Sequence, residues 1–449
     1  MIMSIIEKIE AAGVVGCGGA GFPTHKKLAG NIEYLIINGA ECEPLLRTDR
    51  YLMRNKAPQL VKTVAALGKE LQIPNLVIAV KHHYAEEVAA LRAAISEAKV
   101  PISIHELESF YPAGDEQTIV YEVTGRIVPP GGIPIAAGAV VDNVATVYSI
   151  ALAMEGYPFT QKYLTVTGEV KKPTVLKAPV GSNIMECIAF AGGTKIQDFC
   201  VVSGGPMMGR LIPAEELDSA VVTKTTSALL VLPADGYHAR TNAVDLDRMV
   251  RRAKAACIQC SACTQLCPRH LLGHPLEPHR IMRKLAMKGD LSTLVLDPTV
   301  QNAALCCECG ICEVFACPMG LFPRKINHLL KGEMAKEGIR WSGNAAGMDV
   351  SPLPEERKAP SEKAAARAGV HKYYDYEIKD LVTYVSKRVE IPVKMHIGAP
   401  CVPTVRVGDY VYHGTVIAQP PEGALGAVIH ASIDGKVTAV GERIVIEKE

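Results

Sequence analysis

Nine of the 14 cysteines of this chain lie between residues 257 and 317, in two runs of nearly the same spacing. The first run reads Cys-x-x-Cys-x-x-Cys-x-x-x-Cys-Pro, and the second differs by one extra residue before its last cysteine. Thiolates with this spacing ligate paired [4Fe–4S] clusters, and the fourth cysteine of each run reaches the other cluster. We therefore expect two one-electron carriers. The expected ligand sets are Cys257, Cys260, Cys263 and Cys317 for one cluster, and Cys306, Cys309, Cys312 and Cys267 for the other.

Zinc sites and metal-free core cysteines are the alternatives for these runs. Zinc ribbons use two Cys-x-x-Cys pairs, and a third and fourth cysteine followed by Pro do not match that spacing. Cys307 is a rival ligand inside the second run, and we interpret it as a bystander. The extra residue before Cys317 leaves the crossed pairing open. The remaining cysteines are interpreted as small buried hydrophobic residues: Cys17, Cys42, Cys187, Cys200 and Cys401.

A glycine-rich stretch at residues 16–27 is the second candidate for chemistry. Glycines let backbone amides approach a phosphate or a flat ring, and a helix start directly after them adds positive potential. The stretch contains neither Gly-Lys-Ser/Thr nor a clean G-x-G-x-x-G pattern. As a bare pattern it is equally typical of a structural turn.

The elements around these motifs indicate a multidomain α/β protein. Short apolar runs at 34–37 and 76–80 predict buried strands, and residues 58–71 and 85–98 have helical spacing, which together favour a largely parallel sheet. Residues 240–335 are expected to be helical, and the last 60 residues, which alternate β-branched residues with turns, to be all-β. The expected units are 1–158 (Rossmann-like α/β), 159–238 (α+β insert), 239–340 (helical, cysteine-rich), 341–385 (mobile linker) and 386–449 (all-β).

Composition limits the classes of function. Hydrophobic residues make up 48% and charged residues 21% of the 449, which is the balance of a folded protein. The net charge of +1 gives no bulk attraction to nucleic acid or anionic lipid. No uninterrupted apolar run of about 18 residues is present, and the first residues do not resemble a secretory signal. We expect no transmembrane segment and a reducing compartment.

Four segments resemble the NADH-oxidising subunit of respiratory complex I and its relatives. They are Gly-Gly-Ala-Gly-Phe-Pro-Thr at 18–24, Asn-Gly-Ala-Glu-Cys-Glu-Pro at 38–44, Tyr-Pro-Ala-Gly-Asp-Glu-Gln at 111–117 and Val-Asp-Asn-Val-Ala-Thr at 141–146. Complex I has an Asp where this chain has Ala40, so some hydrogen bonds to flavin or NADH must differ. The Ala-Glu-Cys-Glu-Pro form is more similar to the Rnf complex C subunit and to the cobalamin reductases of propanediol-utilising microcompartments.

The resemblance implies a set of site residues. Those implied for FMN are Gly16, Gly18, Gly19, Gly21, Phe22, Thr24, Lys27, Asn38, Asn143 and Thr146. Those implied for the isoalloxazine and nicotinamide side, as catalytic residues, are Glu41, Glu43 and Glu116. For each acidic residue the alternative is a solvated helix cap.

Two further parts of the chain resemble the same families. Residues 163–193 are similar to the soluble-ligand-binding β-grasp (SLBB) insert, for which we favour a structural role over cobalamin binding. Residues 399–437 resemble a barrel-sandwich (lipoyl-like) module that lacks the lysine hairpin for lipoate or biotin. This module lies at the N-terminus of the Rnf subunit but at the C-terminus of the cobalamin reductase. The order here favours the cobalamin reductase family.

The resemblance implies an enzyme that passes electrons from NADH to FMN, to two [4Fe–4S] clusters and then to an acceptor, with corrin cobalt favoured. The implied partners are a corrinoid or B12-dependent enzyme system, an adenosyltransferase and microcompartment shell proteins, in the cytoplasm or inside such a compartment. One alternative is an Rnf-type subunit that links NADH and ferredoxin at a membrane. The other is a non-enzymatic electron-relay or docking protein.

Overall fold

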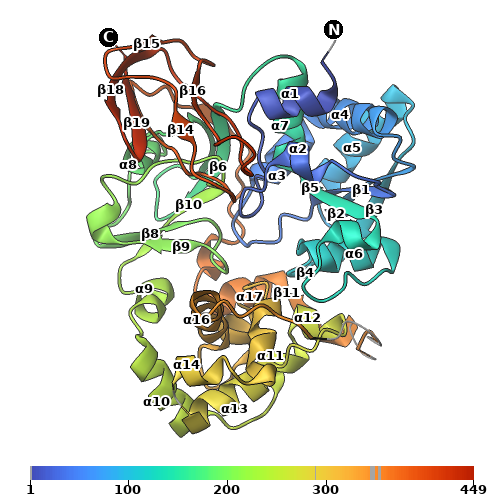
Figure 1. The fold of residues 1–449 in the computed structure, drawn as a ribbon, viewed down its shortest axis with the longest axis vertical. Coiled ribbons are helices and arrows are strands. Elements are labelled where there is room, and N and C mark those ends of the chain that lie inside the picture. The colour runs from blue at the N-terminus through green and yellow to red at the C-terminus, as the bar shows by residue number, and fades with distance from the viewer. Residues whose placement is uncertain (1–2, 289, 344–348, 352–354, 449) are drawn as a thin grey trace.

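The computed structural model describes residues 3–288, 290–343, 349–351 and 355–448 (Figure 1). The N-terminal α/β part lies in the upper right of Figure 1, the α+β part and the C-terminal β part lie in the upper left, and the cysteine-rich helical part lies below both.

The N-terminal part is built on a four-stranded parallel sheet with the order β3-β2-β1-β5. Its central strand places Ile36 between Val77 and Val141, and all three are buried. Parallel strands covered on both faces read as continuous apolar runs, which is why the sequence signal was clear. The expected parallel α/β fold is confirmed. The strands are β1 (Tyr34–Gly39), β2 (Asn75–Lys81), β3 (Ile102–Leu107) and β5 (Ala139–Asn143), and the helices are α1 (Ile5–Ala11), α2 (Thr24–Lys27), α3 (Thr48–Asn55), α4 (Ala57–Glu70), α5 (Ala85–Ala98), α6 (Glu116–Thr124) and α7 (Val144–Met154).

The α+β part contains a six-stranded mixed sheet with the order β12-β7-β6-β10-β8-β9. Helix α8 (Ile184–Phe190) packs on it through Ile184, Cys187 and Ile188. The strands are β6 (Gln161–Gly168), β7 (Thr174–Pro179), β8 (Phe199–Ser203), β9 (Arg210–Ile212), β10 (Ala228–Pro233) and β12 (Leu381–Thr383).

The cysteine-rich part is helical, as expected, with a core that includes Met249, Leu285 and Leu330 from its longer helices. Short helical turns and loops between these helices carry the cysteines. The helices are α9 (Tyr237–Asn242), α10 (Leu246–Ala256), α11 (Ala262–Gln265), α12 (Pro268–Leu271), α13 (Pro278–Lys288), α14 (Leu291–Leu294), α15 (Pro298–Gln301) and α16 (Pro323–Lys336), with η3 (Asn302–Leu305) and the π-helical turn η4 (Cys312–Ala316).

Residues 355–385 do not form the mobile linker that the sequence predicted. Strand β11 (Ala359–Pro360) pairs with β4 (Phe110–Tyr111), and β12 pairs in parallel with β7. Between them, α17 (Ser361–Arg367) buries Ala364 and Ala365. The Pro-, Lys- and Glu-rich composition suggested a solvated chain, but it conceals a short alanine-rich face that packs against other parts. Residues 344–348 and 352–354 of the expected linker lie outside the described residues.

The C-terminal part is all-β, as expected, and comprises two small antiparallel sheets with the orders β13-β19-β18-β15 and β14-β16-β17. A buried lysine joins it to the rest: Lys224 Nζ donates to the carbonyls of Gly13 (2.7 Å) and Val428 (2.8 Å). The strands are β13 (Arg388–Pro392), β14 (Val402–Pro403), β15 (Tyr410–Val411), β16 (Val416–Gln419), β17 (Ile429–His430), β18 (Gly435–Val440) and β19 (Arg443–Glu447).

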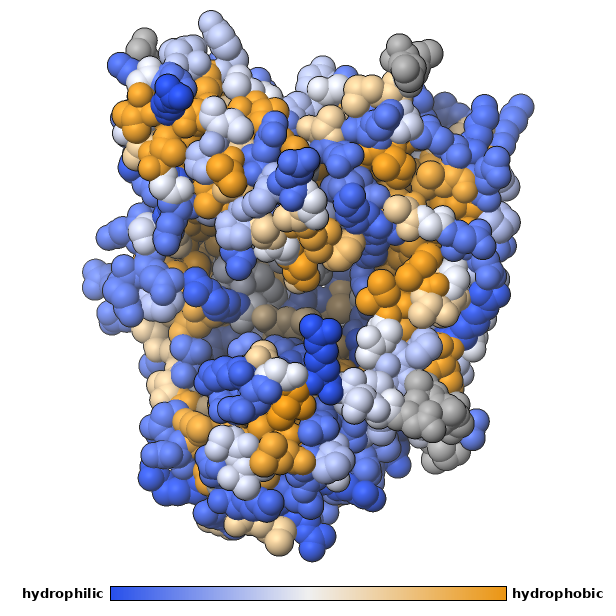
Figure 2. Space-filling model, viewed as in Figure 1, coloured by the Kyte–Doolittle hydropathy of each residue, from blue (hydrophilic) through white to orange (hydrophobic). Residues whose placement is uncertain are grey.

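Figure 2 shows the face of the molecule hollowed where the two upper lobes meet the lower one. In the described part of the chain, no helix combines the length and the apolar character that crossing a membrane requires.

Candidate functional site

The glycine-rich loop lies at the carboxyl end of the parallel sheet. A Cβ on Gly18 would come within 3.1 Å of the Cβ of Asn143, at the end of β5. Gly21 has a φ of +76°, and a Cβ there would lie 2.8 Å from Thr225 and 3.1 Å from the Cα of His396. Gly18 and Gly19 are exposed, so their backbone amides are open to a ligand.

Lys27, at the end of α2, connects the loop to strand β5 and to the start of α6. Its Nζ donates to Glu116 Oε1 at 2.6 Å and to the carbonyl of Val141, and it lies 3.7 Å from Asp142 Oδ1. Burial works against the charge of Lys27, but the two carboxylates outweigh burial and raise its pKa. Burial raises the pKa of Asp142 to about 6, and its Oδ2 has no hydrogen-bond partner among the described residues. This edge therefore retains an unused acceptor beside a fixed ammonium.

Asn143 is held by its helix and by a carboxylate. Its Oδ1 accepts from the amide of Ala145, which caps α7, and its Nδ2 donates to Asp49 Oδ2 at 2.6 Å. The hydroxyl of Thr146 accepts from the amide of Cys17 at 2.9 Å. The expected residues Asn143 and Thr146 therefore fix the loop and the start of α7 in one arrangement.

Glu41 points toward the start of α3. Its carboxylate accepts from the amides of Asp49 (2.8 Å) and Arg50 (3.2 Å). Burial raises the pKa of Glu41, and burial together with the charge of Glu41 raises the pKa of Asp49 to about 8. Glu41 therefore caps helix α3, as the alternative to a catalytic role predicted. It differs from that alternative in being buried and not solvated.

Glu43 lies where the N-terminal α/β part, the α+β part and the cysteine-rich part meet. Its Oε2 accepts from the amide of Met207 at 2.9 Å, and its Oε1 lies 3.2 Å from the hydroxyl of Tyr111. Burial raises the pKa of Glu43 to about 7. The Tyr111 hydroxyl also donates to the carbonyl of Cys309 at 2.6 Å. Tyr111 therefore connects Glu43, near the carboxyl end of the parallel sheet, to the second cysteine run.

The remaining expected residues differ in position. Asn38 fixes the same edge, since its Nδ2 donates to the carbonyl of Gly114 and its Oδ1 accepts from the amide of Ala40. Glu116 begins α6 and is half exposed beside Lys27. Phe22 is 36% exposed, whereas Thr24 is buried and its hydroxyl has no hydrogen-bond partner within the part of the chain that the structure describes.

A cavity of about 390 Å³ opens beside Glu41 and Glu43. Its walls include Lys81, which is 2% exposed and whose Nζ donates only weakly, at 3.3 Å, to Ser361 Oγ. Burial lowers the pKa of Lys81 to about 8. Three arginines and a segment of the expected linker complete the lining, which includes Arg47, Arg50, Arg54, Tyr374 and Lys379.

The two cysteine runs share an unusual backbone. Gln259 and Ser261 have positive φ values of 55° and 59°, and the equivalent Glu308 and Gly310 have values of 58° and 80°. Side chains or amides also donate to sulfur: Gln259 Nε2 to Cys257 at 3.0 Å, and the amide of Glu308 to Cys306 at 3.4 Å. Left-handed residues repeated in both runs, together with N–H groups that donate to sulfur, fit a cluster held by several cysteines.

The fourth cysteine of each run lies near the other run. The charges of Cys317, Cys260 and Cys257 act, after burial, on the thiol of Cys263, whose pKa rises to about 12. Burial likewise raises the pKa of Cys267, with further contributions from Cys307 and Cys306. Among the residues that the structure describes, no three His, Cys, Asp or Glu side chains are close enough for a single metal ion.

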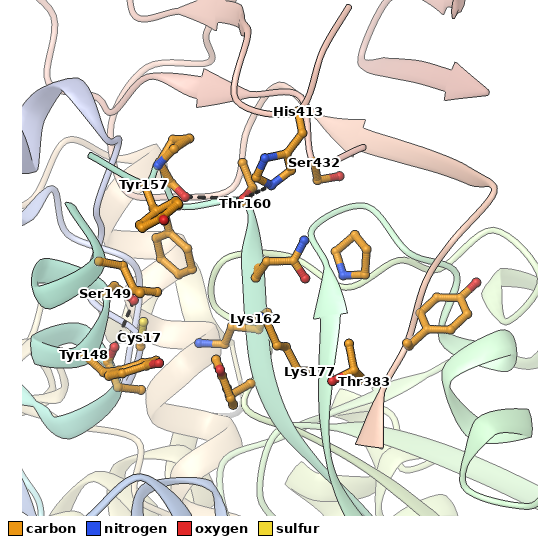
Figure 3. Close-up of a pocket in the computed structure, with 18 of the residues that line it drawn as sticks. Cys17, Tyr148, Ser149, Tyr157, Thr160, Lys162, Lys177, Thr383, His413 and Ser432 are labelled. Carbon is orange, nitrogen blue, oxygen red and sulfur yellow. Dashed lines mark hydrogen bonds between the residues drawn. The ribbon is translucent and has the colours of Figure 1, made fainter. Parts of the chain in front are cut away.

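A separate cavity of about 480 Å³ lies between α7, the strands β6 and β7 and the C-terminal sheets (Figure 3). Figure 3 shows Cys17 and Tyr148 on one wall and His413 near Ser432 on another, with His413 Nε2 2.8 Å from the hydroxyl of Thr160. The sequence assigned no role in binding to these lining residues.

Sequence reasoning assigned no role to several residues that lie near the carboxyl end of the parallel sheet. Asp49, Lys81 and Asp142 are buried charged groups that it did not assign. Tyr111 and Asp115 lie within a segment that it did single out, and Arg269, which pairs with Asp115, directly follows Cys267-Pro268. Their proximity in sequence to the motifs was a usable signal, but their contacts join residues up to 198 positions apart.

The fold and the site together define a flavin-binding iron–sulfur oxidoreductase. Residues 9–152 match the Nuo51 FMN-binding domain, residues 163–211 the SLBB domain, residues 256–322 a 4Fe-4S dicluster domain and residues 369–449 the RnfC barrel sandwich hybrid domain. The expected domain types, FMN-binding and iron–sulfur domains included, are therefore confirmed.

The chain belongs to the cobalamin reductase PduS family. It is 39% identical over 442 residues to the cobalamin reductase PduS of Salmonella typhimurium, with 98% of this chain and 95% of the relative covered. It is 38% identical over 441 residues to that of Citrobacter freundii, with the same coverage. A solved structure of an NAD⁺-reducing [NiFe]-hydrogenase in its H2-reduced state is 20% identical, with a TM-score of 0.49, covering 78% of this chain and 65% of that chain.

Proposed function

We propose that this protein is an NADH-dependent flavin and iron–sulfur oxidoreductase that reduces corrin cobalt. The relatives named cobalamin reductase PduS support the acceptor, and the matches to an FMN-binding domain and a 4Fe-4S dicluster domain support the carriers. When bound, FMN exchanges electrons in pairs or singly, and each [4Fe–4S] cluster carries one electron.

In this proposal the chain's residues position the carriers. Gly18 and Gly19 offer backbone amides to the FMN phosphate and ribityl chain, and Lys27 supplies a fixed positive charge. Thr146 holds the loop through the amide of Cys17, and Asn143, itself held by Asp49, packs beside Gly18. The proposed ligands are the eight cysteines expected from the sequence, in crossed sets; the proximity of Cys317 to Cys263 and of Cys267 to Cys306 supports the crossing.

The cavity beside Glu41 and Glu43 is the proposed NADH site. Lys81 and Arg47 offer cations for a pyrophosphate, whereas Arg50 and Arg54, which also line the cavity, already pair with Glu87. Glu43 lies at the nicotinamide side, and with a pKa near 7 it can hold or release a proton there. Tyr374 and Lys379, from the segment first expected as a linker, line one side of this cavity.

One observation carries the proposal: the Tyr111 hydroxyl lies between the carboxylate of Glu43 and the carbonyl of Cys309. The site that would take electrons in pairs thus adjoins the loop that would carry them singly. The proposal also includes a cytoplasmic setting inside a bacterial microcompartment, with an adenosyltransferase and shell proteins nearby.

The test is anaerobic reconstitution of the full chain with FMN, iron and sulfide. We expect about eight irons per chain and NADH-dependent bleaching of flavin and cluster absorbance. Addition of aquacobalamin after NADH should produce the spectrum of reduced cobalt, and the same mixture without NADH is the control. Iron uptake without flavin binding or an NADH reaction would overturn the proposal, and reduction of ferredoxin but not of cobalamin would favour the Rnf-type alternative.

A further inference from the structure

The two cysteine runs have unequal surroundings. In the second run, Cys309 and Cys312 are 7% and 6% exposed. In the first run, Cys260 is exposed and its neighbour Ile258 is 62% exposed. We call residues 306–312 the inner loop and residues 257–263 the outer loop.

Two connections hold the inner loop against the residues near Glu43, at the carboxyl end of the parallel sheet. One is the Tyr111 hydroxyl, which donates to the carbonyl of Cys309 at 2.6 Å. The other passes through Met207, whose amide donates to Glu43 and whose carbonyl accepts from Arg324 Nη1 at 3.3 Å. A Cβ on Gly310 would lie only 3.1 Å from that carbonyl, so the inner loop packs closely on Met207.

Tyr111 is itself held rigidly. It is 1% exposed, and its strand β4 pairs with β11 through Ala359. A buried, packed ring that donates to the carbonyl of a ligand residue sets the position of that loop relative to Glu43, and outer hydrogen bonds of this kind also influence cluster potentials. The outer loop instead presents exposed side chains to solvent, where a partner can approach it.

We propose that electrons enter the iron–sulfur part at the inner loop and leave it at the outer loop, with Tyr111 as the positioning residue at the entry. The inference rests on the proposed function. Each NADH supplies two electrons and one proton. With FMN and both clusters bound, the electrons would pass singly to the cluster that the inner loop helps to hold and then to that of the outer loop, and would reduce two one-electron acceptors, while the proton would go to solvent.

The test uses the reconstituted full chain and electron paramagnetic resonance of samples poised with dithionite. The variant Cys260→Ser marks the outer signal, because it alters or removes that cluster while leaving the inner ligands intact. The variant Tyr111→Phe removes only a hydroxyl. Its matched control is Tyr373→Phe, which removes a hydroxyl from the same buried cluster that donates to Glu169 at 2.8 Å instead of to a cysteine of either run.

We expect Tyr111→Phe to shift the signal that Cys260→Ser leaves unchanged, and Tyr373→Phe to shift neither. In rapid mixing with NADH, that same inner signal should develop first, and Tyr111→Phe should slow its appearance about fivefold, the equivalent of one hydrogen bond. Cys260→Ser should keep the fast development of the inner signal but lose reduction of an added one-electron acceptor. Ferricyanide is not used as that acceptor, because it also oxidises buried carriers.

The proposal is overturned if the outer signal develops first, or if Tyr111→Phe shifts the signal marked by Cys260→Ser. A wild-type protein that never reacts with NADH would instead contradict the proposed function. The dithionite titration would still show which cluster Tyr111 contacts, so the two failures are distinguishable.

Discussion

The guanidinium of Arg269 binds the carboxylate of Asp115 at two points, Nη1 to Oδ1 and Nη2 to Oδ2, the latter at 3.0 Å. Asp115 caps α6 beside Glu116, and Arg269 follows the last cysteine of the first run. Burial alone would raise the pKa of Asp115, but Arg269 and the hydrogen bonds from Thr118 lower it. The pair therefore joins the flavin-domain edge to the cysteine-rich part.

Replacing Arg269 should weaken the connection between these two parts. Arg269→Met leaves the buried Asp115 charge without its partner, and we expect a loss of about 3 kcal/mol in the free energy of unfolding of the cysteine-rich part. Thermal melting followed by circular dichroism, with iron release recorded in parallel, measures it. Arg280→Met, which removes an exposed partner of Glu277, is the control and should change little. Equal melting of both variants would contradict the interpretation.

The glycine loop can be tested without disturbing the fold. A Cβ on Gly19 would meet no atom of the described residues within 4 Å, so Gly19→Ala should leave the unfolding midpoint unchanged. If the loop approaches FMN closely, the methyl group should weaken flavin binding about tenfold or more, as read from quenching of flavin fluorescence. Gly332→Ala, at another open position, is the control. Unchanged flavin affinity in Gly19→Ala would place the flavin elsewhere.

Lys27 should matter for binding more than its neighbour does. Lys27→Met removes the ammonium that contacts Glu116 and leaves the buried Asp142 uncompensated. We expect flavin affinity to fall by about tenfold, since a hydrogen bond to a charged group contributes about 1.5 to 3 kcal/mol. Lys26→Met, at an exposed position on the same turn, controls for net charge. The comparison fails if both variants bind flavin equally.

Lys224 should give stability a distinct pH dependence. Burial lowers its pKa from 10.5 to about 7, so between these values the unfolded chain binds more protons than the folded one. Stability from this group therefore rises with pH across that window, by up to about 1.4 kcal/mol per pH unit. Urea unfolding at pH 7 and pH 9 should show a smaller rise for Lys224→Met than for the wild type. Lys436→Met, at an exposed position, should follow the wild type.

The sequence determined much of this protein locally. The apolar runs around Ile36 and Val77 specified parallel strands because such strands are buried on both faces. The two cysteine runs and the glycine stretch identified the chemistry because ligand geometry and close backbone approach require those residues at short, fixed separations. Each of these signals lies within one short segment of the sequence.

Only the tertiary structure decided which of these local units touch. The contacts of Tyr111 with Cys309, of Asp115 with Arg269 and of Lys224 with Val428 each join segments more than 150 residues apart. The pairing of β11 with β4 and of β12 with β7 depends on strands that other parts supply, so composition alone suggested a free linker over residues 355–385. Contacts of this kind follow from packing of the whole chain, and no spacing pattern within one segment encodes them.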